Sequence, residues 1–363
     1  MNRRLVRLRW WALGAAVAPG LVACSTLGPA AIRGGRAAYN QAITSTDNQQ
    51  LLGLIVKTRY AENVQLLAVS SVTANMSISA RVGADFGVGP DANFAGNLVP
   101  LTSGVVVEEN PTISYVPIEG EQYFRELLSP VPLDLALLLI NASDEPGDAF
   151  SALVANINEI PNHAFVDPSS APDPRFAEVV DLLRRLDAAN ALSWRVAGAT
   201  PEAHTYAIVL NWPARLDAEV RDLLSLLGTP PTAERRAVLP LGFGDGSQGG
   251  DVVWIGTRSI GELVKIASAA MDVAPEHRSR GLVTEPIREL GHTGRLITVR
   301  GSKTRPRDAY VDFQQHGWWY SIAHDDTASK RYFKLLSTLI SIRITETLGS
   351  ANGTPVLTIP TAN

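Results

Sequence analysis

The chain has 363 residues, of which 45% are hydrophobic and 19% charged, and its 32 basic and 36 acidic residues give a formal net charge of −4. This composition is typical of a folded protein, so it excludes a wholly disordered, collagen-like or polytopic membrane chain. The single cysteine excludes an internal disulfide framework. The length fits two domains or one large domain.

Residues 1–23 have the features of a secretory signal peptide. A basic segment without acidic residues comes first and contains Arg3, Arg4, Arg7 and Arg9. An apolar run from Trp10 to Ala18 follows and ends at Pro19. The run is too short for a transmembrane helix, which needs about 20 apolar residues. Its length instead suits the apolar region of a signal peptide.

The segment Leu21-Val22-Ala23-Cys24 comes directly after this run and resembles the lipobox of bacterial lipoproteins. The resemblance implies that Cys24 carries a diacylglyceryl group, that cleavage follows Ala23, and that the new N-terminus is acylated. Each buried CH₂ group contributes about 0.8 kcal/mol, so several acyl chains anchor a protein stably, whereas one alone is marginal. The alternative is an ordinary signal peptide with a chance cysteine. By the same resemblance, Ser25 favours the outer membrane over the inner membrane.

The charge balance bears on the partners of the mature chain. Cleavage would remove four basic residues and no acidic one, so the mature chain would be more acidic. A net acidic protein is a poor general binder of nucleic acid. We therefore expect the membrane as a partner through the lipid at Cys24, with no nucleic acid. An envelope protein or glycan is a possible further partner, and a homo-oligomer stays open.

The N-terminal part of the mature chain is expected to form a tether and then a helix. Residues 24–45 begin with small residues and predict a tether. Thr46 and Gln49 fit a capping box, and the apolar positions from Leu51 to Tyr60 follow at helical spacing. The pattern therefore predicts a helix that begins at Thr46.

A long hairpin is expected over residues 72–118. Apolar and polar or small residues alternate without a break from Val72 to Val88, which predicts an unusually long strand. A second extended run ends at Ile118. In one interpretation, the apolar face of this hairpin covers a domain core. In the other, several copies supply hairpins to a channel wall; Glu109 and Pro111 weaken that interpretation, because they share the parity of the apolar positions of the second run.

The second half predicts alternating helices and strands. The segment Val166–Pro174 is rich in Pro, Ser and Asp and is the expected boundary between domains 46–166 and 174–363. Asp173 and Pro174 are typical of a helix start, and Gly228 of a helix end. A hairpin is expected to turn at His316-Gly317, before a helix over residues 327–345. The predicted fold class is α+β, with the long N-terminal hairpin followed by a mixed C-terminal domain.

Candidate catalytic motifs have simpler structural interpretations. The glycine-rich stretch from Gly242 to Gly246 precedes an expected strand, whereas a dinucleotide fingerprint precedes a helix. Ser259 lacks the glycine two residues before it that a hydrolase elbow needs, and with Glu262 it fits a capping box. No two of the six histidines have the i, i+4 spacing of a zinc helix. His324-Asp325-Asp326 is expected to cap the following helix. We therefore predict no catalytic residue, cofactor or metal site.

Two segments are candidate binding surfaces. A basic run in the acidic chain could contact an anionic lipid or glycan, or it could be a solvated strand and loop; it comprises Arg295, Arg300, Lys303, Arg305 and Arg307. Trp318, Trp319 and Tyr320 lie on one strand of the expected C-terminal hairpin. These three aromatic residues could stabilise the core or the sheet, or form a platform for a partner or glycan.

The mature chain also resembles a group of proteobacterial envelope lipoproteins. The resemblance rests on four segments: Tyr39-Asn40-Gln41-Ala42-Ile43, Leu51 to Tyr60, Val69-Ser70-Ser71-Val72 and Asp308-Ala309-Tyr310-Val311. None of these is a catalytic motif, so the resemblance implies an envelope location, and no site residue is carried over from it. We expect a non-enzymatic lipoprotein, anchored in the outer membrane and facing the periplasm, that binds or scaffolds envelope components. The alternatives are a subunit of an oligomeric export channel or accessory ring, and a periplasmic hydrolase.

Overall fold

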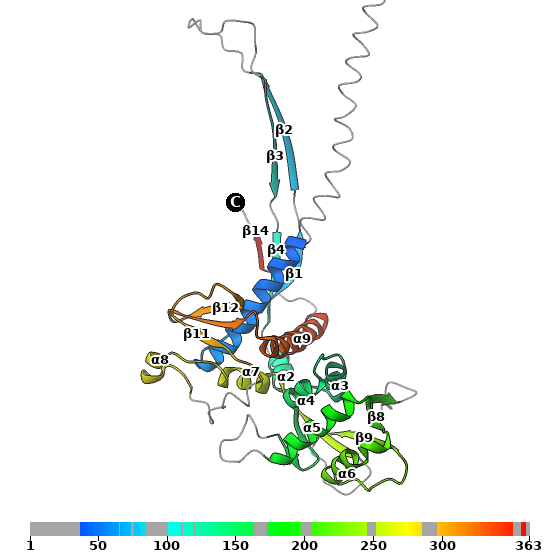
Figure 1. The fold of residues 1–363 in the computed structure, drawn as a ribbon. Coiled ribbons are helices and arrows are strands. Elements are labelled where there is room, and N and C mark those ends of the chain that lie inside the picture. The colour runs from blue at the N-terminus through cyan, green and yellow to red at the C-terminus, as the bar shows by residue number, and fades with distance from the viewer. Residues whose placement is uncertain are drawn as a thin grey trace, which may run out of the picture.

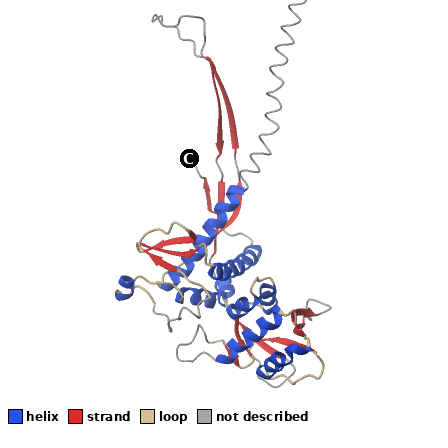
Figure 2. Ribbon diagram, viewed as in Figure 1, coloured by secondary structure: helices blue, strands red, loops and turns tan. Residues whose placement is uncertain are grey.

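The computed structural model describes residues 37–64, 66–73, 76–84, 101–109, 112–118, 121–162, 173–197, 205–244, 252–284, 296–350 and 357–360. Helices and sheets are mixed along the chain, so the fold is α+β as the sequence predicts (Figures 1 and 2).

The first described element is a helix over residues 37–59, followed by nested antiparallel strands. Strands β1 (Leu66–Thr73), β4 (Thr112–Ile118) and β14 (Leu357–Pro360) form a sheet in the order β1-β4-β14. Strands β2 (Met76–Ala84) and β3 (Leu101–Glu109) form a separate two-stranded ribbon that extends away from the rest of the molecule (Figure 1).

The expected strand over residues 72–88 is divided between these two sheets. β1 pairs with β4 and ends at Thr73, whereas β2 begins at Met76 and pairs with β3. Residues 74–75 and 85–88 lie outside the described residues. The long hairpin is therefore present as two nested strand pairs, and the alternating pattern continues from one pair into the other.

Three short helices connect the first sheet to the second. They are α2 (Glu121–Leu128), α3 (Leu133–Asn141) and α4 (Pro146–Leu153). The second sheet has six strands in the order β6-β5-β10-β9-β8-β7. Its strands are β5 (Val154–Ile157), β6 (Ile160–Pro161), β7 (Leu192–Ala197), β8 (Thr205–Asn211), β9 (Arg236–Phe243) and β10 (Val253–Thr257). β9 and β10 are parallel, and the other neighbouring pairs are antiparallel.

The order of the six strands does not follow the expected domain division. β5 and β6 precede the segment 166–174, yet β5 pairs with β10, which follows it. In the same way, β14 from the end of the chain pairs with β4. The segment 166–174 therefore does not separate two independent sheets. Two helices lie between strands of this sheet in the sequence. Helix α5 (Pro174–Ala188) precedes β7, and the 3-10 turn η3 (Ala214–Leu216) and helix α6 (Asp217–Leu226) lie between β8 and β9.

The last part of the chain forms a small sheet and the longest helix among the described residues. Helices α7 (Ile260–Ala269) and α8 (Pro275–Ser279) precede a sheet in the order β11-β13-β12. Its strands are β11 (Arg300–Ser302), β12 (Ala309–Gln315) and β13 (Trp318–Ala323), and helix α9 (Thr327–Ser350) follows. The turn between β12 and β13 has positive φ at both His316 and Gly317, as a tight hairpin turn requires. The predicted turn is confirmed.

Local capping signals explain several helix boundaries. The side chain of Asp173 accepts from the backbone of Arg175, and Pro174 opens α5. Ser259 and Glu262 form the complete capping box at the start of α7. Gly228, just after α6, has a φ of +66°. These three predictions are confirmed. The predicted start at Thr46 is wrong, because the helix already runs from residue 37 and the Thr46 hydroxyl donates to the Ile43 carbonyl inside it.

The described residues outside the β2–β3 ribbon, called the body below, share one hydrophobic core. It includes Leu52 and Ile55 from the N-terminal helix, Ile157 and Ile208 from the six-stranded sheet, and Leu339 from α9, all fully buried. Segments far apart in the sequence therefore fold together. Among the described helices, none has the length and the apolar character that crossing a membrane would require.

Candidate functional site

A cavity of about 430 Å³ lies between helices α4, α5 and α9. Small residues face it from each helix: Ala149 and Ala152 from α4, Ala177 from α5 and Ala328 from α9. Short side chains on three neighbouring helices leave space that longer ones would fill. The volume falls in the range of small-molecule sites, which measure roughly 300–1,000 Å³.

Phe176, Val180, Leu296 and Leu335 add further apolar surface to the cavity wall. Phe176 and Val180 are buried, and both come from the face of α5 that packs on the core. An apolar wall favours a ligand with an apolar part, because contact with this wall removes the ligand's apolar surface from water.

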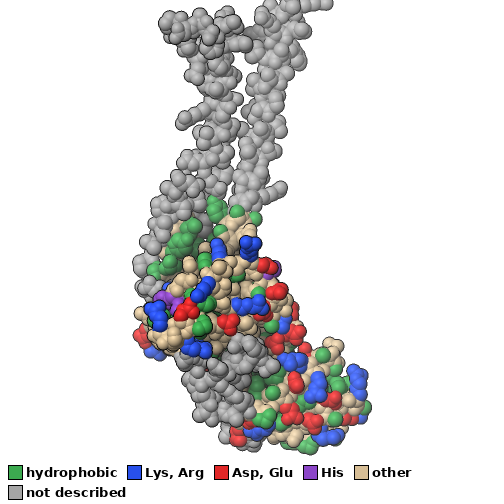
Figure 3. Space-filling view, turned by 60° about the vertical axis from the view of Figure 1, so that its left-hand side comes forward, with side chains coloured by type: hydrophobic (Ala, Val, Ile, Leu, Met, Phe, Trp, Pro, Cys, Tyr) green, Lys and Arg blue, Asp and Glu red, His purple; other side chains and the backbone are tan. Residues whose placement is uncertain are grey.

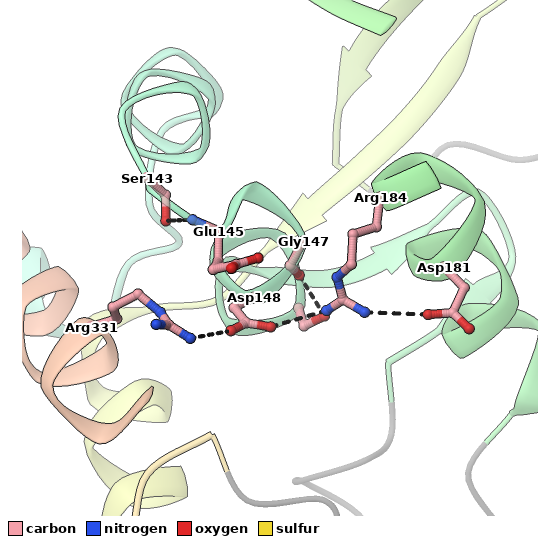
Figure 4. Close-up of polar contacts among 8 residues, drawn as sticks. Ser143, Glu145, Gly147, Asp148, Asp181, Arg184 and Arg331 are labelled. Atoms are coloured by element: carbon pink, nitrogen blue, oxygen red, sulfur yellow. Dashed lines mark hydrogen bonds and ion pairs between the residues drawn. The ribbon is translucent and has the colours of Figure 1, made fainter. Parts of the chain in front are cut away.

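Four charged side chains of alternating sign lie at the cavity (Figure 4). Arg184 of α5 donates to Asp148 of α4 at 3.0 Å and to Asp181 at 3.2 Å. Arg331 of α9 donates to the other oxygen of Asp148 at 3.2 Å. The Asp148 carboxylate is therefore shared by two guanidinium groups from two different helices. These contacts are partly exposed, so each ion pair contributes little to stability.

The two arginines differ in how completely they are satisfied. The Arg184 guanidinium makes two ion pairs and lies against Gly147, where an added Cβ atom would come within 2.7 Å of Nε. Glycine at this position therefore lets α4 approach the Arg184 side chain. Arg331 makes one ion pair, and its buried Nε atom has no hydrogen-bond partner among the described residues.

A buried polar network supports the cavity floor. Asn162 donates from Nδ2 to the carbonyls of Ser151 and Val154, at 2.9 and 2.7 Å. The fully buried Arg258 guanidinium donates to the carbonyls of Ser151, Ala152 and Asn162, at 2.7–2.8 Å. Burial lowers the pKa of Arg258 to about 10, which still leaves the group charged at neutral pH. The network fixes the C-terminal end of α4 by satisfying carbonyls that the helix itself leaves open.

The hydroxyl groups near the cavity are engaged in local hydrogen bonds. The Ser151 hydroxyl donates to the Gly147 carbonyl at 2.8 Å, and the Ser143 hydroxyl accepts from the backbone of Glu145. The Tyr332 hydroxyl donates to the Leu263 carbonyl, and burial raises the pKa of Tyr332. In the described part of the chain, no three His, Cys, Asp or Glu side chains gather as metal ligands do. The cavity can therefore recognise a ligand by its shape, by apolar contact and by charge.

The residues of the predicted basic run have separate contacts. Cys24 and Arg295 lie outside the described residues. Lys303 forms an ion pair with Glu276 and lies over the Trp318 ring, whereas Arg305 donates to both oxygens of Asp312. Arg300 and Arg307 are exposed. Acidic and basic side chains are intermixed over the face drawn in Figure 3. Lys303 and Arg305 therefore form ion pairs with carboxylates of this chain, and an external anion would have to compete with these carboxylates.

The three aromatic residues of the predicted platform differ in exposure. Tyr320 is fully buried, which favours the core interpretation at that position. Trp318 is half-buried and donates from Nε1 to Glu276, and Trp319 is half-buried with the Arg305 guanidinium 5.0 Å from its ring centre. Two indole rings therefore reach the surface beside paired charges.

Tyr320 belongs to a buried polar cluster that no sequence pattern predicts. The Tyr60 hydroxyl is hydrogen-bonded to His277 Nδ1 at 2.6 Å and to the Tyr320 hydroxyl at 2.5 Å. All three side chains are buried. Burial lowers the pKa of His277 and raises the pKa of both tyrosines. The cluster joins the end of the N-terminal helix to α8 and β13, and we interpret it as a structural link.

The charged residues of the cavity carry no signal in the sequence. Asp148 and Arg184 are 36 positions apart, and Asp148 and Arg331 are 183 positions apart. No local motif connects them, so only the packing of α9 against α4 brings them together. The helical spacing of α5 predicts which of its residues are buried but not what they face.

Comparisons of the chain with models of protein families, with curated proteins and with solved structures find no match. The interpretation of the cavity therefore rests on its residues and their geometry.

Proposed function

We propose that this protein is a non-enzymatic lipoprotein, anchored in the bacterial outer membrane through Cys24, that binds a small molecule in the cavity between α4, α5 and α9. The observation that carries the binding role is the cavity itself. It combines an apolar wall with a charged edge, the combination that orients small molecules in binding sites. The lipobox-like segment supports the anchor.

The arrangement of the body supports a tethered binding module. The N-terminal helix (residues 37–59), drawn in blue, begins at the end of the body from which the β2–β3 ribbon extends, whereas α4 and α5 lie farther from the ribbon (Figure 1). A fully extended chain from Cys24 to residue 37 would span at most about 45 Å. An anchor at Cys24 would therefore hold the ribbon end of the body near the membrane and leave the cavity end away from it.

Two experiments test this proposal, one for each part. In a Gram-negative host, globomycin should cause the uncleaved precursor to accumulate, and a Cys24→Ser variant should lose the attached lipid in mass spectrometry of the exported chain. Normal processing in the presence of globomycin would contradict the anchor.

Ligand binding is tested on the full lipidated chain in lipid nanodiscs. Titration with 1-octanol and octanoate, corrected by titration of empty nanodiscs, should give saturable heat. The Ala328→Trp variant fills the cavity from an exposed position of α9 and should abolish this heat, whereas Lys334→Trp, exposed on the same helix outside the cavity, should retain it. The binding role is refuted if neither compound binds, or if Ala328→Trp binds as the unmodified chain does.

A second candidate function, assembly into an export channel or accessory ring, is favoured by the ribbon. β2 and β3 pair in register over nine positions and form a sheet of two strands only. Such a ribbon is marginally stable alone in water, and its two open edges can pair with further strands. If all ribbons in a ring point the same way, β3 of one copy lies antiparallel beside β2 of the next, which repeats the pairing within one chain.

The register also distributes residue types in a way that suits a wall between two environments. One set of paired positions is mainly apolar and holds Met76, Ile78, Ala80, Val82 and Ala84, opposite Glu109, Val107, Val105, Ser103 and Leu101. The other set holds Ser77, Ser79, Arg81 and Gly83, opposite Glu108, Val106, Gly104 and Thr102. Glu109 lies at the last paired position, at the foot of the ribbon, and Pro111 lies outside the described residues. The mass of the complex extracted in mild detergent tests this function, and a monomer would contradict it.

A further inference from the structure

We propose that the cavity binds an amphipathic oxyanion, a molecule with an apolar body and one carboxylate or phosphate group, and that Arg331 receives this group. The inference rests on the proposed binding function and adds the chemical class of the ligand. It depends on three features of the described residues: one incompletely satisfied guanidinium, one shared carboxylate and an apolar wall.

Arg331 has unused capacity to donate hydrogen bonds. Its side chain is 33% exposed and makes a single ion pair with Asp148, at 3.2 Å. Its Nε atom is buried and without a hydrogen-bond partner among the described residues. A buried donor without an acceptor is unfavourable, and a planar guanidinium binds a carboxylate or phosphate through two parallel hydrogen bonds. When Arg331 is released from Asp148, a ligand oxyanion would accept from two of its guanidinium nitrogens.

Asp148 does not need Arg331 as its partner. Its other oxygen accepts from Arg184 at 3.0 Å, and Arg184 also holds Asp181 (Figure 4). If a ligand binds Arg331 in place of Asp148, the Asp148 carboxylate still has Arg184 of α5 as its counter-ion. The cost of releasing Arg331 is therefore that of one partly exposed ion pair, which contributes little to stability.

The wall beside the charges determines the rest of the ligand. Ala149, Ala152, Phe176 and Leu335 line the same cavity as Arg331. An inorganic anion alone would leave this apolar surface in contact with water. An alcohol would cover the surface but offer the guanidinium one neutral acceptor, without the charge and the second oxygen of a carboxylate or phosphate. An apolar body that ends in an oxyanion satisfies both parts of the cavity.

The test compares three eight-carbon probes on the full lipidated chain in nanodiscs: 1-octanol, octanoate and octyl phosphate. Hydrogen bonds to a charged group are worth about 1.5–3 kcal/mol, so we expect octanoate to bind about 10–100 times more tightly than 1-octanol. Comparison of octyl phosphate with octanoate shows whether the site prefers a phosphate or a carboxylate group. Tighter binding of octyl phosphate than of octanoate identifies a phosphate head group, and the reverse order identifies a carboxylate; either preference over 1-octanol supports the proposal.

Substitutions at the two ends of one ion pair should have opposite effects. Arg331→Gln should reduce the preference for octanoate over 1-octanol to less than about threefold, because the remaining guanidinium, Arg184, is already held by Asp148 and Asp181. Asp148→Asn should strengthen octanoate binding several-fold, because it removes the carboxylate that competes for Arg331. Arg221→Gln changes an exposed charge on α6, outside the cavity, and should leave the preference unchanged.

The outcomes separate this inference from the binding function. If octanoate and 1-octanol bind equally and Ala328→Trp abolishes both, the cavity binds ligands and the oxyanion inference is refuted. If Arg331→Gln and Asp148→Asn shift octanoate binding in the same direction, the ion pair only supports the helices and the inference is again refuted. Melting temperatures of all variants, measured in parallel, show whether each one is folded, and Arg331→Lys replaces Arg331→Gln if that variant unfolds.

Discussion

Arg258 is the residue on which we expect the fold to depend most strongly. Its fully buried guanidinium donates to three carbonyls, those of Ser151, Ala152 and Asn162. Arg258→Met would remove the guanidinium donors of the Ala152 and Asn162 carbonyls, whereas the Ser151 carbonyl would keep Asn162 Nδ2 as a donor. Each buried acceptor left without a donor costs about 1–3 kcal/mol. We expect the free energy of unfolding in urea to fall by about 3–5 kcal/mol. Arg236→Met, at an exposed position of β9, should change it by less than about 0.5 kcal/mol, and an equal effect of the two variants would contradict this role of Arg258.

His277 should make the stability of the body sensitive to acid. Burial lowers its pKa in the folded chain, only partly offset by Glu276, whereas the unfolded value is about 6.5. The unfolded chain therefore binds the proton more readily. The stabilisation from the neutral ring is complete above the unfolded pKa and declines as the pH falls from there through the folded pKa.

The pH dependence of urea unfolding between pH 7.5 and 5 measures this effect. His277→Gln keeps an acceptor for the Tyr60 hydroxyl but does not titrate, so the unfolding free energy of this variant should decline less over that range. His324→Gln, at an exposed position, should decline as the unmodified chain does. Identical curves for His277→Gln and the unmodified chain would show that the protonation of His277 is not linked to folding.

At the scale of single elements, the capping box of α7 gives a direct prediction. The Ser259 hydroxyl accepts from the backbone of Glu262 at 3.2 Å, and the Glu262 carboxylate accepts from the backbone of Ser259 at 2.8 Å. Ser259→Ala should therefore lower the free energy of unfolding by about 1 kcal/mol. Ser279→Ala, whose hydroxyl donates only to the Glu276 carbonyl at an exposed site, is the control and should have a smaller effect in the same urea titration.

The ribbon is the element that we expect the body to tolerate losing. Thr73 and Thr112 are paired directly, so Asn-Gly in place of residues 74–111 would close β1 and β4 with a two-residue turn. The melting temperature of the body should change by less than a few degrees. If the ribbons assemble, this variant should be monomeric in mild detergent where the unmodified chain is not. A large loss of stability would show that the ribbon belongs to the core.

These elements also show how far the sequence determines the fold. The caps at Asp173 and Ser259 and the turn at His316-Gly317 depend on neighbouring residues, and the sequence predicts all three. Thr46 carries the same kind of capping signal, but it does not begin a helix. The residues before it, from 37 onward, are already helical, so Thr46 lies inside the helix. The partners of Asp148 lie on α5 and α9, so no local pattern predicts the charged edge of the cavity.

At the scale of the whole molecule, strand order decides how the chain unfolds. β5 precedes residues 163–172 and pairs with β10, which follows them. One core includes side chains from the N-terminal helix, the six-stranded sheet and α9. Composition alone suggests a boundary at 166–174, but the two sides share both a sheet and a core. We therefore expect one cooperative unfolding transition for the body, with coincident midpoints in tryptophan fluorescence and far-UV circular dichroism.

Dissection of the chain at this segment is the stronger form of the same prediction. Residues 24–170 and 171–363, produced separately, should each lack a cooperative transition, because the first half leaves β5 without β10 and the second leaves the edge of β10 open. Produced together, the halves should associate and recover the transition, since the contacts between them are those of the intact core. Independent folding of either half, with its own sharp transition, would mean that the composition marks a true domain boundary and that the shared sheet forms only after two domains have folded.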